Sequence, residues 1–153
     1  MPTGWRIVKE KHQGTAFDGE GARIHGGRWN SVGTPCVYAA ESISLALLEI
    51  VVHTETASLL AHYSLISVSF AEGVVSTLDT SALPENWREP LISPRTQAIG
   101  DEWVESRQSA VLRVPSALTG MEYNYLINPH HSDFGQLEIG EPKKIPIDPR
   151  LRT

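Results

Sequence analysis

The sequence predicts a single α+β domain of residues 1–153. Short runs of strand-favouring residues are separated by turn residues, and two segments carry the signals with which helices begin. These elements do not alternate regularly along the chain, which argues against a doubly wound sheet. A chain of 153 residues is also long enough to bury a core without metal or disulfide crosslinks.

Two strands and a helix are expected in the first third of the chain. Residues 5–8 are mostly apolar and predict a strand, and the glycine-rich residues 14–27 predict a long loop. Residues 35–40 predict a second strand, which leads into a helix over residues 43–52 with Ser42 as its N-cap. This helix is apolar nearly all round, so we expect it to be central and well buried.

The middle of the chain predicts a hairpin and a second helix. Residues 62–70 alternate between two faces, and residues 74–78 continue the β character after a glycine, which favours a hairpin. A proline-punctuated loop follows. Ser93 and Pro94 then fit the N-cap and the first position of a helix that ends near Arg107.

The last third of the chain predicts β structure. Residues 110–114 form an apolar strand closed by Pro115. Residues 123–128 predict a turn-rich return, and residues 139–147, which contain two prolines, predict a final edge strand.

Charge and composition narrow the classes of function. A net charge of −5 argues against nucleic-acid binding, which needs a basic face. The single cysteine, Cys36, cannot form an internal disulfide and suits a reducing compartment, so a cytoplasmic protein is expected. No run approaches the roughly 20 apolar residues of a membrane helix, and the first residues lack the apolar core of a signal peptide.

Glu49 is the first candidate functional residue, because it interrupts the apolar helix. A buried carboxylate is costly unless something compensates it. One interpretation is an ion pair with His53 one turn later, or an exposed position on the helix. The other is a functional carboxylate, since buried acids gather at active sites as well as in structural pairs.

Two arginines are candidates for binding an anion. Arg28 follows Gly26 and Gly27, whose backbone freedom permits close approach of a ligand, and its planar guanidinium can hold a phosphate. The alternative is a solvated arginine on a surface turn. Arg6 lies between Trp5 and Ile7, where it is either an edge cation or part of a pocket wall.

Further candidates lie on strands or at strand ends, where polar recognition groups are often placed. Tyr38 precedes the helix of Glu49, and its ring can stack on a flat heterocycle or serve as half-buried core. Ser116 follows a strand, and Asn124 and Asn128 flank an apolar run; each is also a common turn residue.

Several known constellations are absent from the sequence. Gly19-Glu20-Gly21 lacks the third glycine and the flanking strand and helix of a dinucleotide fingerprint, and there is no P-loop. The six histidines show no metal-ligand spacing, so no metal is expected.

Taken in order, the segments resemble the RES family, the toxins of bacterial RES–Xre toxin–antitoxin pairs, and the resemblance covers almost the whole chain. The segments that carry it are Trp5-Arg6, Gly27-Arg28-Trp29-Asn30, Val37-Tyr38-Ala39-Ala40, Leu48-Glu49 with His53, Val114-Pro115-Ser116-Ala117 and Asn124-Tyr125-Leu126-Ile127-Asn128-Pro129.

The resemblance implies a fold similar to ADP-ribosyltransferases, NAD⁺ as substrate and not as cofactor, and an Xre-type antitoxin as partner. By the same analogy the active site is lined by Arg28, Tyr38 and Glu49. Ser116 is the family's serine. Arg6 and Asn128, which rest on a looser match, would assist in binding the substrate.

The implied chemistry is cleavage of the nicotinamide–ribose bond, with water or phosphate as acceptor. Cleavage builds positive charge on the ribose, which a carboxylate such as Glu49 stabilises. The alternatives are ADP-ribosyl transfer to a cellular protein and a catalytically silent nucleotide-binding module. No direct contact with nucleic acid or membrane is expected, and a homo-oligomer is compatible with the sequence.

Overall fold

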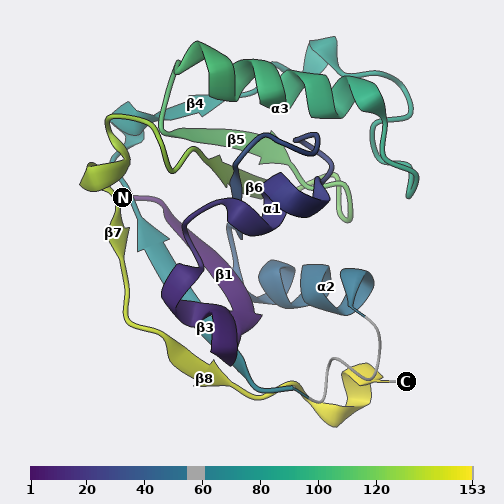
Figure 1. The fold of residues 1–153 in the computed structure, drawn as a ribbon. Helices are drawn as coiled ribbons and strands as arrows, with labels where there is room; N and C mark the ends of the chain where they lie inside the picture. The colour runs from purple at the N-terminus through teal and green to yellow at the C-terminus, as the bar shows by residue number, and fades with distance from the viewer. Residues whose placement is uncertain (55–60, 153) are drawn as a thin grey trace.

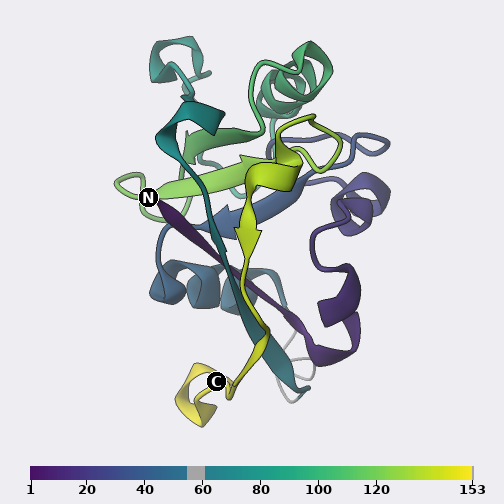
Figure 2. The same ribbon diagram turned by 90° about the vertical axis from the view of Figure 1, so that its left-hand side faces the viewer.

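The strands form one strongly bent sheet (Figures 1 and 2). The computed structural model describes residues 1–54 and 61–152, and within them eight strands follow the order β4-β5-β6-β2-β1-β3-β7, with β8 also paired to β3. The strands are β1 Thr3–Lys9, β2 Val37–Ala40, β3 Tyr63–Ser69, β4 Val75–Thr77, β5 Val111–Pro115, β6 Tyr123–Ile127, β7 Glu138–Ile139 and β8 Lys143–Ile145. β4 and β5 run parallel, whereas the other named pairs are antiparallel.

The bend falls between β1 and β2. These strands share one register pair, Trp5 with Ala40, whereas β1 pairs with β3 over its whole length. Figure 1 shows β1 and β3 running across the direction of β5 and β6. The sheet therefore has two halves that diverge at the strand that carries Tyr38.

Two longer helices cover different parts of this sheet, and their capping is as predicted. They are α2 Ile43–His53 and α3 Pro94–Ser106, and a shorter helix is α1 Glu20–His25. The Ser42 hydroxyl accepts a hydrogen bond from the backbone N–H of Leu45, and that of Ser93 accepts one from Arg95. Helix α2 packs on β1 and β2, whereas Trp103 of α3 packs against β5 and β6.

The described residues also contain short 3-10 turns. They are Glu10–Thr15, Glu72–Val74, Thr80–Ala82, Phe134–Gln136 and Pro149–Arg152.

The core consists of three apolar clusters. One lies on one side of the sheet around Phe70 and Tyr125, whose rings meet edge to face at 5.0 Å between centroids. A second joins α2 to β1 and β3 around Leu45 and Ile7, and a third joins α3 to β5 and β6 around Trp29. α2 and α3 thus anchor separate clusters, with β2 and β6 between them.

The structure confirms the prediction of a single compact α+β domain, but it corrects three details. The hairpin over residues 62–78 is wrong, because β4 joins β5 at the far edge of the sheet instead of pairing with β3. The loop predicted over residues 14–27 contains α1, whose first turn is fixed when the Asp18 carboxylate accepts the N–H of Glu20. The return predicted over residues 123–128 is the central strand β6.

Helix α2 is also less buried than predicted. Leu45 and Ala46 are buried, but Leu48 is 41% exposed and Val52 is 54% exposed. The final edge strand is confirmed as β7 and β8, both paired to β3. Among the described residues, none of the helices has the length and apolar character needed to cross a bilayer.

Candidate active site

Glu49 lies on α2 where the helix passes the end of β6. The amide nitrogen of Asn124 donates to Glu49 Oε1 at 3.3 Å, and His53 Nε2 lies 3.2 Å from Glu49 Oε2. Asn124 reaches this position because it pairs in register with Ala40 of β2, the strand that leads into α2. The Glu49 side chain remains 29% exposed, so the carboxylate is held from two sides and still open to a ligand.

The pair with His53 confirms the structural interpretation of Glu49 without removing the functional one. The hydrogen bond to Glu49 is the largest influence on His53 and raises its pKa, while partial burial acts in the opposite direction. The His53 side chain is 63% exposed, so it lies at the rim of the site and not inside it.

The turn that carries Arg28 is held by the hydroxyl of Tyr38. That hydroxyl donates to Asn30 Oδ1 and accepts the backbone N–H of Trp29 at 3.1 Å. Asn30 is completely buried, and its amide nitrogen donates to the carbonyl oxygens of Ala22 and Thr34. The Tyr38 hydroxyl therefore fixes the two residues that follow Arg28.

Two glycines permit this close packing. A Cβ atom at Gly27 would lie 2.7 Å from the Tyr38 hydroxyl oxygen, and one at Gly100 of α3 would lie 1.6 Å from the carbonyl oxygen of Trp29. Gln97 of α3 also donates to the Gly27 carbonyl at 3.1 Å. The turn is thus clamped between β2 and α3.

Arg28 lies in this clamped turn. Its Nη1 donates to the carbonyl oxygen of Trp87 at 2.7 Å, and among the described residues no other partner hydrogen-bonds its guanidinium. Desolvation by burial lowers the pKa of Arg28, while the nearby Glu49 and Tyr38 act to raise it. Arg28, Tyr38 and Glu49 are therefore close enough to interact electrostatically, although they come from three separate segments.

Arg6 occupies the place where β1 and β2 diverge. Its Nε donates to the carbonyl oxygen of Ala16 at 2.7 Å, and its Nη1 donates to that of Tyr38 at 3.0 Å. Desolvation by burial lowers its pKa, and Cys36 and Asp18 act in the opposite direction. Arg6 thus supports the backbone of Tyr38, and none of its hydrogen bonds reaches Arg28 or Glu49.

Ser116 is completely buried at the end of β5. Its hydroxyl accepts the backbone N–H groups of Leu118 and Thr119 at 3.1 and 3.3 Å, which shapes the turn into β6. Direct contact between Ser116 and a nucleotide stays a prediction, because this hydroxyl faces its own turn.

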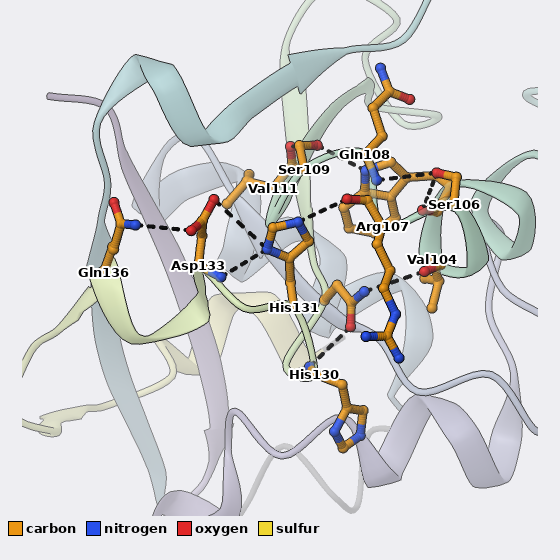
Figure 3. A network of polar contacts seen from close by, with 12 residues as sticks. Val104, Ser106, Arg107, Gln108, Ser109, Val111, His130, His131, Asp133 and Gln136 are labelled. Carbon is orange, nitrogen blue, oxygen red and sulfur yellow. Dashed lines mark hydrogen bonds and ion pairs between the residues drawn. The ribbon is translucent and has the colours of Figure 1, made fainter.

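Asn128 lies at the opposite end of β6 from Asn124. The neighbouring His130 and His131 belong to the polar network of Figure 3. The amide nitrogen of Asn128 donates to the Val104 carbonyl at 3.4 Å, and its oxygen accepts the N–H of His130 at 3.0 Å. Beside it, His131 Nε2 lies 2.9 Å from the Arg107 carbonyl oxygen, which ties this loop to the end of α3. The structure does not bring Asn128 to Glu49, and its predicted role in binding remains untested.

The sequence assigns no role to Asn30 or to the carbonyl of Trp87. It offers Asn124 only as a strand-end candidate, and the register between β2 and β6 places this residue on Glu49. Asn30 directly follows the Gly27-Arg28-Trp29 turn, which was the available signal.

Other features of the molecule lie apart from this site. Burial raises the pKa of the Cys36 thiol to about 12, which makes it a poor nucleophile. Among the described residues, no three histidine, cysteine, aspartate or glutamate side chains gather into a metal site. Two hollows of about 320 and 310 Å³ lie between α3 and β5 and beside Phe17, and Arg28, Tyr38 and Glu49 line neither.

The amino-acid sequence matches a described protein family. Residues 3–148 match the RES domain, and the chain belongs to the RES family. It is 41% identical over 149 residues to a protein named Toxin Res from Photorhabdus laumondii, with 96% of this chain and 95% of that protein covered. It is 36% identical over 152 residues to the Prs ADP-ribosylating toxin of Sphingobium sp., with 96% and 94% covered.

A solved structure confirms the fold. A chain from the M. tuberculosis MbcT–MbcA toxin–antitoxin complex superposes with a TM-score of 0.77 over 98% of this chain and 86% of that one. The two share 23% sequence identity, so this likeness concerns the architecture alone.

Proposed function

We propose that this protein is the toxin of a bacterial toxin–antitoxin pair and that it cleaves the bond between nicotinamide and ribose in NAD⁺. The observation that carries the proposal is the grouping of three residues: the Tyr38 hydroxyl holds the turn of Arg28, and Glu49, held by Asn124 and His53, acts electrostatically on Arg28. The names of the relatives, Toxin Res and ADP-ribosylating toxin, support it.

Glu49 is the proposed centre of catalysis. As the nicotinamide–ribose bond breaks, positive charge develops on the ribose, and a fixed carboxylate stabilises that charge more than it stabilises the ground state. One oxygen of Glu49 can accept a ribose hydroxyl while Asn124 holds the carboxylate in place. Nicotinamide leaves as a neutral base, so no proton or metal is needed at the leaving group.

Arg28 is the proposed binding group for the pyrophosphate of NAD⁺. Trp87 occupies one of its five donors, which leaves the others for phosphate oxygens. Because the turn is clamped by Tyr38 and α3, the guanidinium is positioned before substrate arrives, which reduces the entropy lost on binding.

The remaining predicted residues fit supporting roles in this proposal. The half-buried ring of Tyr38 offers a flat apolar surface for nicotinamide or an adjacent ring. Arg6 holds the backbone of Tyr38 in place. Ser116 and Asn128 are kept as predicted binding residues, to be tested by substitution.

Water or inorganic phosphate is the proposed acceptor, which would make the enzyme a glycohydrolase or a phosphorylase. ADP-ribosyl transfer to a protein is the second candidate, because one relative is named an ADP-ribosylating toxin. Transfer breaks the same bond and differs only in the nucleophile that attacks the ribose.

We further propose an Xre-type antitoxin as partner and the cytoplasm as the site of action. An enzyme that consumes a central cofactor must be kept blocked, and a partner that covers the active site is the simplest block. The structurally similar chain was crystallised in a toxin–antitoxin complex, which supports an antitoxin as partner but carries no information on the Xre type.

The deciding experiment incubates purified protein with NAD⁺, with and without phosphate, and identifies the products. We expect free nicotinamide together with ADP-ribose, or with ADP-ribose 1″-phosphate when phosphate is the acceptor. Adenine-labelled NAD⁺ whose label stays on protein would indicate transfer instead. Intact NAD⁺ after incubation with folded protein would refute the enzyme proposal.

Induction in a bacterial host tests the toxin role separately. We expect growth to stop, and to resume when the neighbouring antitoxin gene is expressed. Normal growth despite abundant folded protein would contradict the toxin role.

A further inference from the structure

Residues 84–92, which we call the connecting segment, contact both Arg28 and the β5–β6 turn. They do so through Trp87 and Arg88. The carbonyl oxygen of Trp87 accepts Nη1 of Arg28 at 2.7 Å. The next residue, Arg88, donates from Nε to the carbonyl oxygen of Ala117 at 3.0 Å and from Nη2 to that of Leu118 at 3.2 Å. Neighbouring residues of one segment therefore contact Arg28 and the β5–β6 turn.

The turn that receives Arg88 is rigid. Its two ends are joined by hydrogen bonds from the N–H of Ser116 to the Glu122 carbonyl and from the N–H of Gly120 to the Ser116 carbonyl, both 2.8 Å. The Ser116 hydroxyl further fixes Leu118, one of the two acceptors of Arg88. A guanidinium bound to two carbonyls of such a turn has one preferred position.

The shape of the turn is fitted to Arg88. Gly120 has φ +68°, and a Cβ atom there would lie 2.7 Å from Nη1 and 2.9 Å from Cζ of Arg88. A side chain at this position would both strain the backbone and displace the guanidinium. The glycine therefore leaves the space that Arg88 occupies.

The connecting segment has few other attachments. The backbone hydrogen bonds found inside it are local, from Trp87 to Pro84 and from Glu89 to Asn86. The Trp87 ring packs beside Trp29, with 6.2 Å between ring centroids, but Leu91 is 85% exposed. The position of the Trp87 carbonyl therefore depends on its ring and on the adjacent Arg88.

We propose that Arg88 is a positioning residue for the nucleotide site: by fixing the connecting segment to the β5–β6 turn, it places the Trp87 carbonyl that orients Arg28. The inference rests on the proposed function in that Arg28 holds the pyrophosphate. It also gives Ser116 a role that needs no contact with the nucleotide, because its hydroxyl shapes the turn that receives Arg88.

The test measures the Kd for ADP-ribose, which contains the pyrophosphate, by calorimetry. The variants are Arg88→Ala, Arg88→Lys, Arg28→Ala, the double variant of Arg28 and Arg88 to alanine, and the control Arg95→Ala. Arg95 is exposed on α3, and its side chain makes no hydrogen bond with the described residues. Arg95→Ala therefore removes the same charge as Arg88→Ala without breaking such a contact. Thermal unfolding of each variant confirms that it is folded.

We expect Arg88→Ala to weaken ADP-ribose binding about fivefold to tenfold, as the loss of one or two hydrogen bonds would. Arg88→Lys should stay weaker than the parent, because lysine keeps the charge but lacks the planar guanidinium. In the Arg28→Ala background the Arg88 substitution should change Kd by less than about twofold, since residues that act through one another are not additive. Arg95→Ala should match the parent.

Three results would overturn the inference: a parent protein that does not bind ADP-ribose, a Kd for Arg88→Ala equal to that of Arg95→Ala, or full recovery by lysine. An additive double variant would show that Arg88 acts independently of Arg28 and would also overturn it. Nicotinamide release is assayed separately, so a protein that binds ADP-ribose but does not cleave NAD⁺ refutes the proposed activity and leaves this inference standing.

Discussion

Tyr38→Phe removes one oxygen atom and tests the clamp on the Arg28 turn. The hydroxyl donates to Asn30 and accepts from Trp29, and these two residues are 0% and 2% exposed. Phenylalanine keeps the ring but leaves a buried carbonyl and a buried N–H without this partner. The structure thus gives the hydroxyl a positioning role in addition to any stacking by the ring.

The expected cost follows from these two contacts. Each buried polar group left unsatisfied costs about 1–3 kcal/mol, so the two groups together should lower the free energy of unfolding by about 2–6 kcal/mol. For a domain of this size each kcal/mol lowers Tm by about 2–4 °C, which predicts a fall of roughly 4–24 °C. The kcat/KM for NAD⁺ should also fall, mainly through a higher KM, because Arg28 loses its fixed position.

Urea unfolding monitored by circular dichroism measures the change in stability. Tyr123→Phe is the matched control, because this side chain is 39% exposed and its hydroxyl makes no hydrogen bond with the described residues. It should change the free energy of unfolding by less than about 0.5 kcal/mol. A Tyr38→Phe variant as stable as Tyr123→Phe would refute the reasoning about the clamp.

Two further predictions concern the pH dependence of α2 and the packing of α3. Glu49 raises the pKa of His53 in the folded state. The pair therefore stabilises the folded state fully at pH values below the unfolded pKa of His53, about 6.5. This stabilisation is lost as the pH rises through the higher pKa of the folded state. Urea unfolding should therefore show His53→Gln destabilised at about pH 5 and equal to the parent at about pH 9; a difference independent of pH would contradict this. Gly100→Ala places a Cβ atom 1.6 Å from the Trp29 carbonyl oxygen and should cost about 3 kcal/mol or more in thermal unfolding. Gly73→Ala, with open space around it, is the control, and equal Tm values for the two variants would be inconsistent with the packing described.

Local signals in the sequence predicted the starts of α2 and α3 and most strands, but not α1. Ser42 and Ser93 are recognisable because an N-cap depends on residues within one turn. The hairpin prediction failed because β4 pairs with β5, whose sequence lies more than thirty residues later, and local alternation does not determine a distant partner. The burial of α2 was overestimated for a related reason, since an apolar helix shows no polar side from which its exposed side can be inferred.

The site was predicted only in part, because local sequence signals mark single residues and not their distant partners. Glu49 stood out because it interrupts an apolar helix, and Arg28 stood out because it follows two glycines. The link between Glu49 and Asn124 depends on the register of β2 and β6, so no local signal singles out Asn124. Asn128 was named because the resemblance to the RES family implied it. The hydroxyl of Tyr38 is engaged by a turn eight residues earlier, a contact that exists only after β2 has folded beside it.

The central claim is that Glu49 stabilises the charge that develops as nicotinamide leaves NAD⁺. The most direct measurement compares nicotinamide release by the parent protein, by Glu49→Gln and by Glu105→Gln, which removes an exposed carboxylate on α3. We expect Glu49→Gln to lose at least about a hundredfold in kcat while remaining folded at the assay temperature, and Glu105→Gln to remain fully active. Release of nicotinamide by Glu49→Gln at the rate of the parent would contradict the claim.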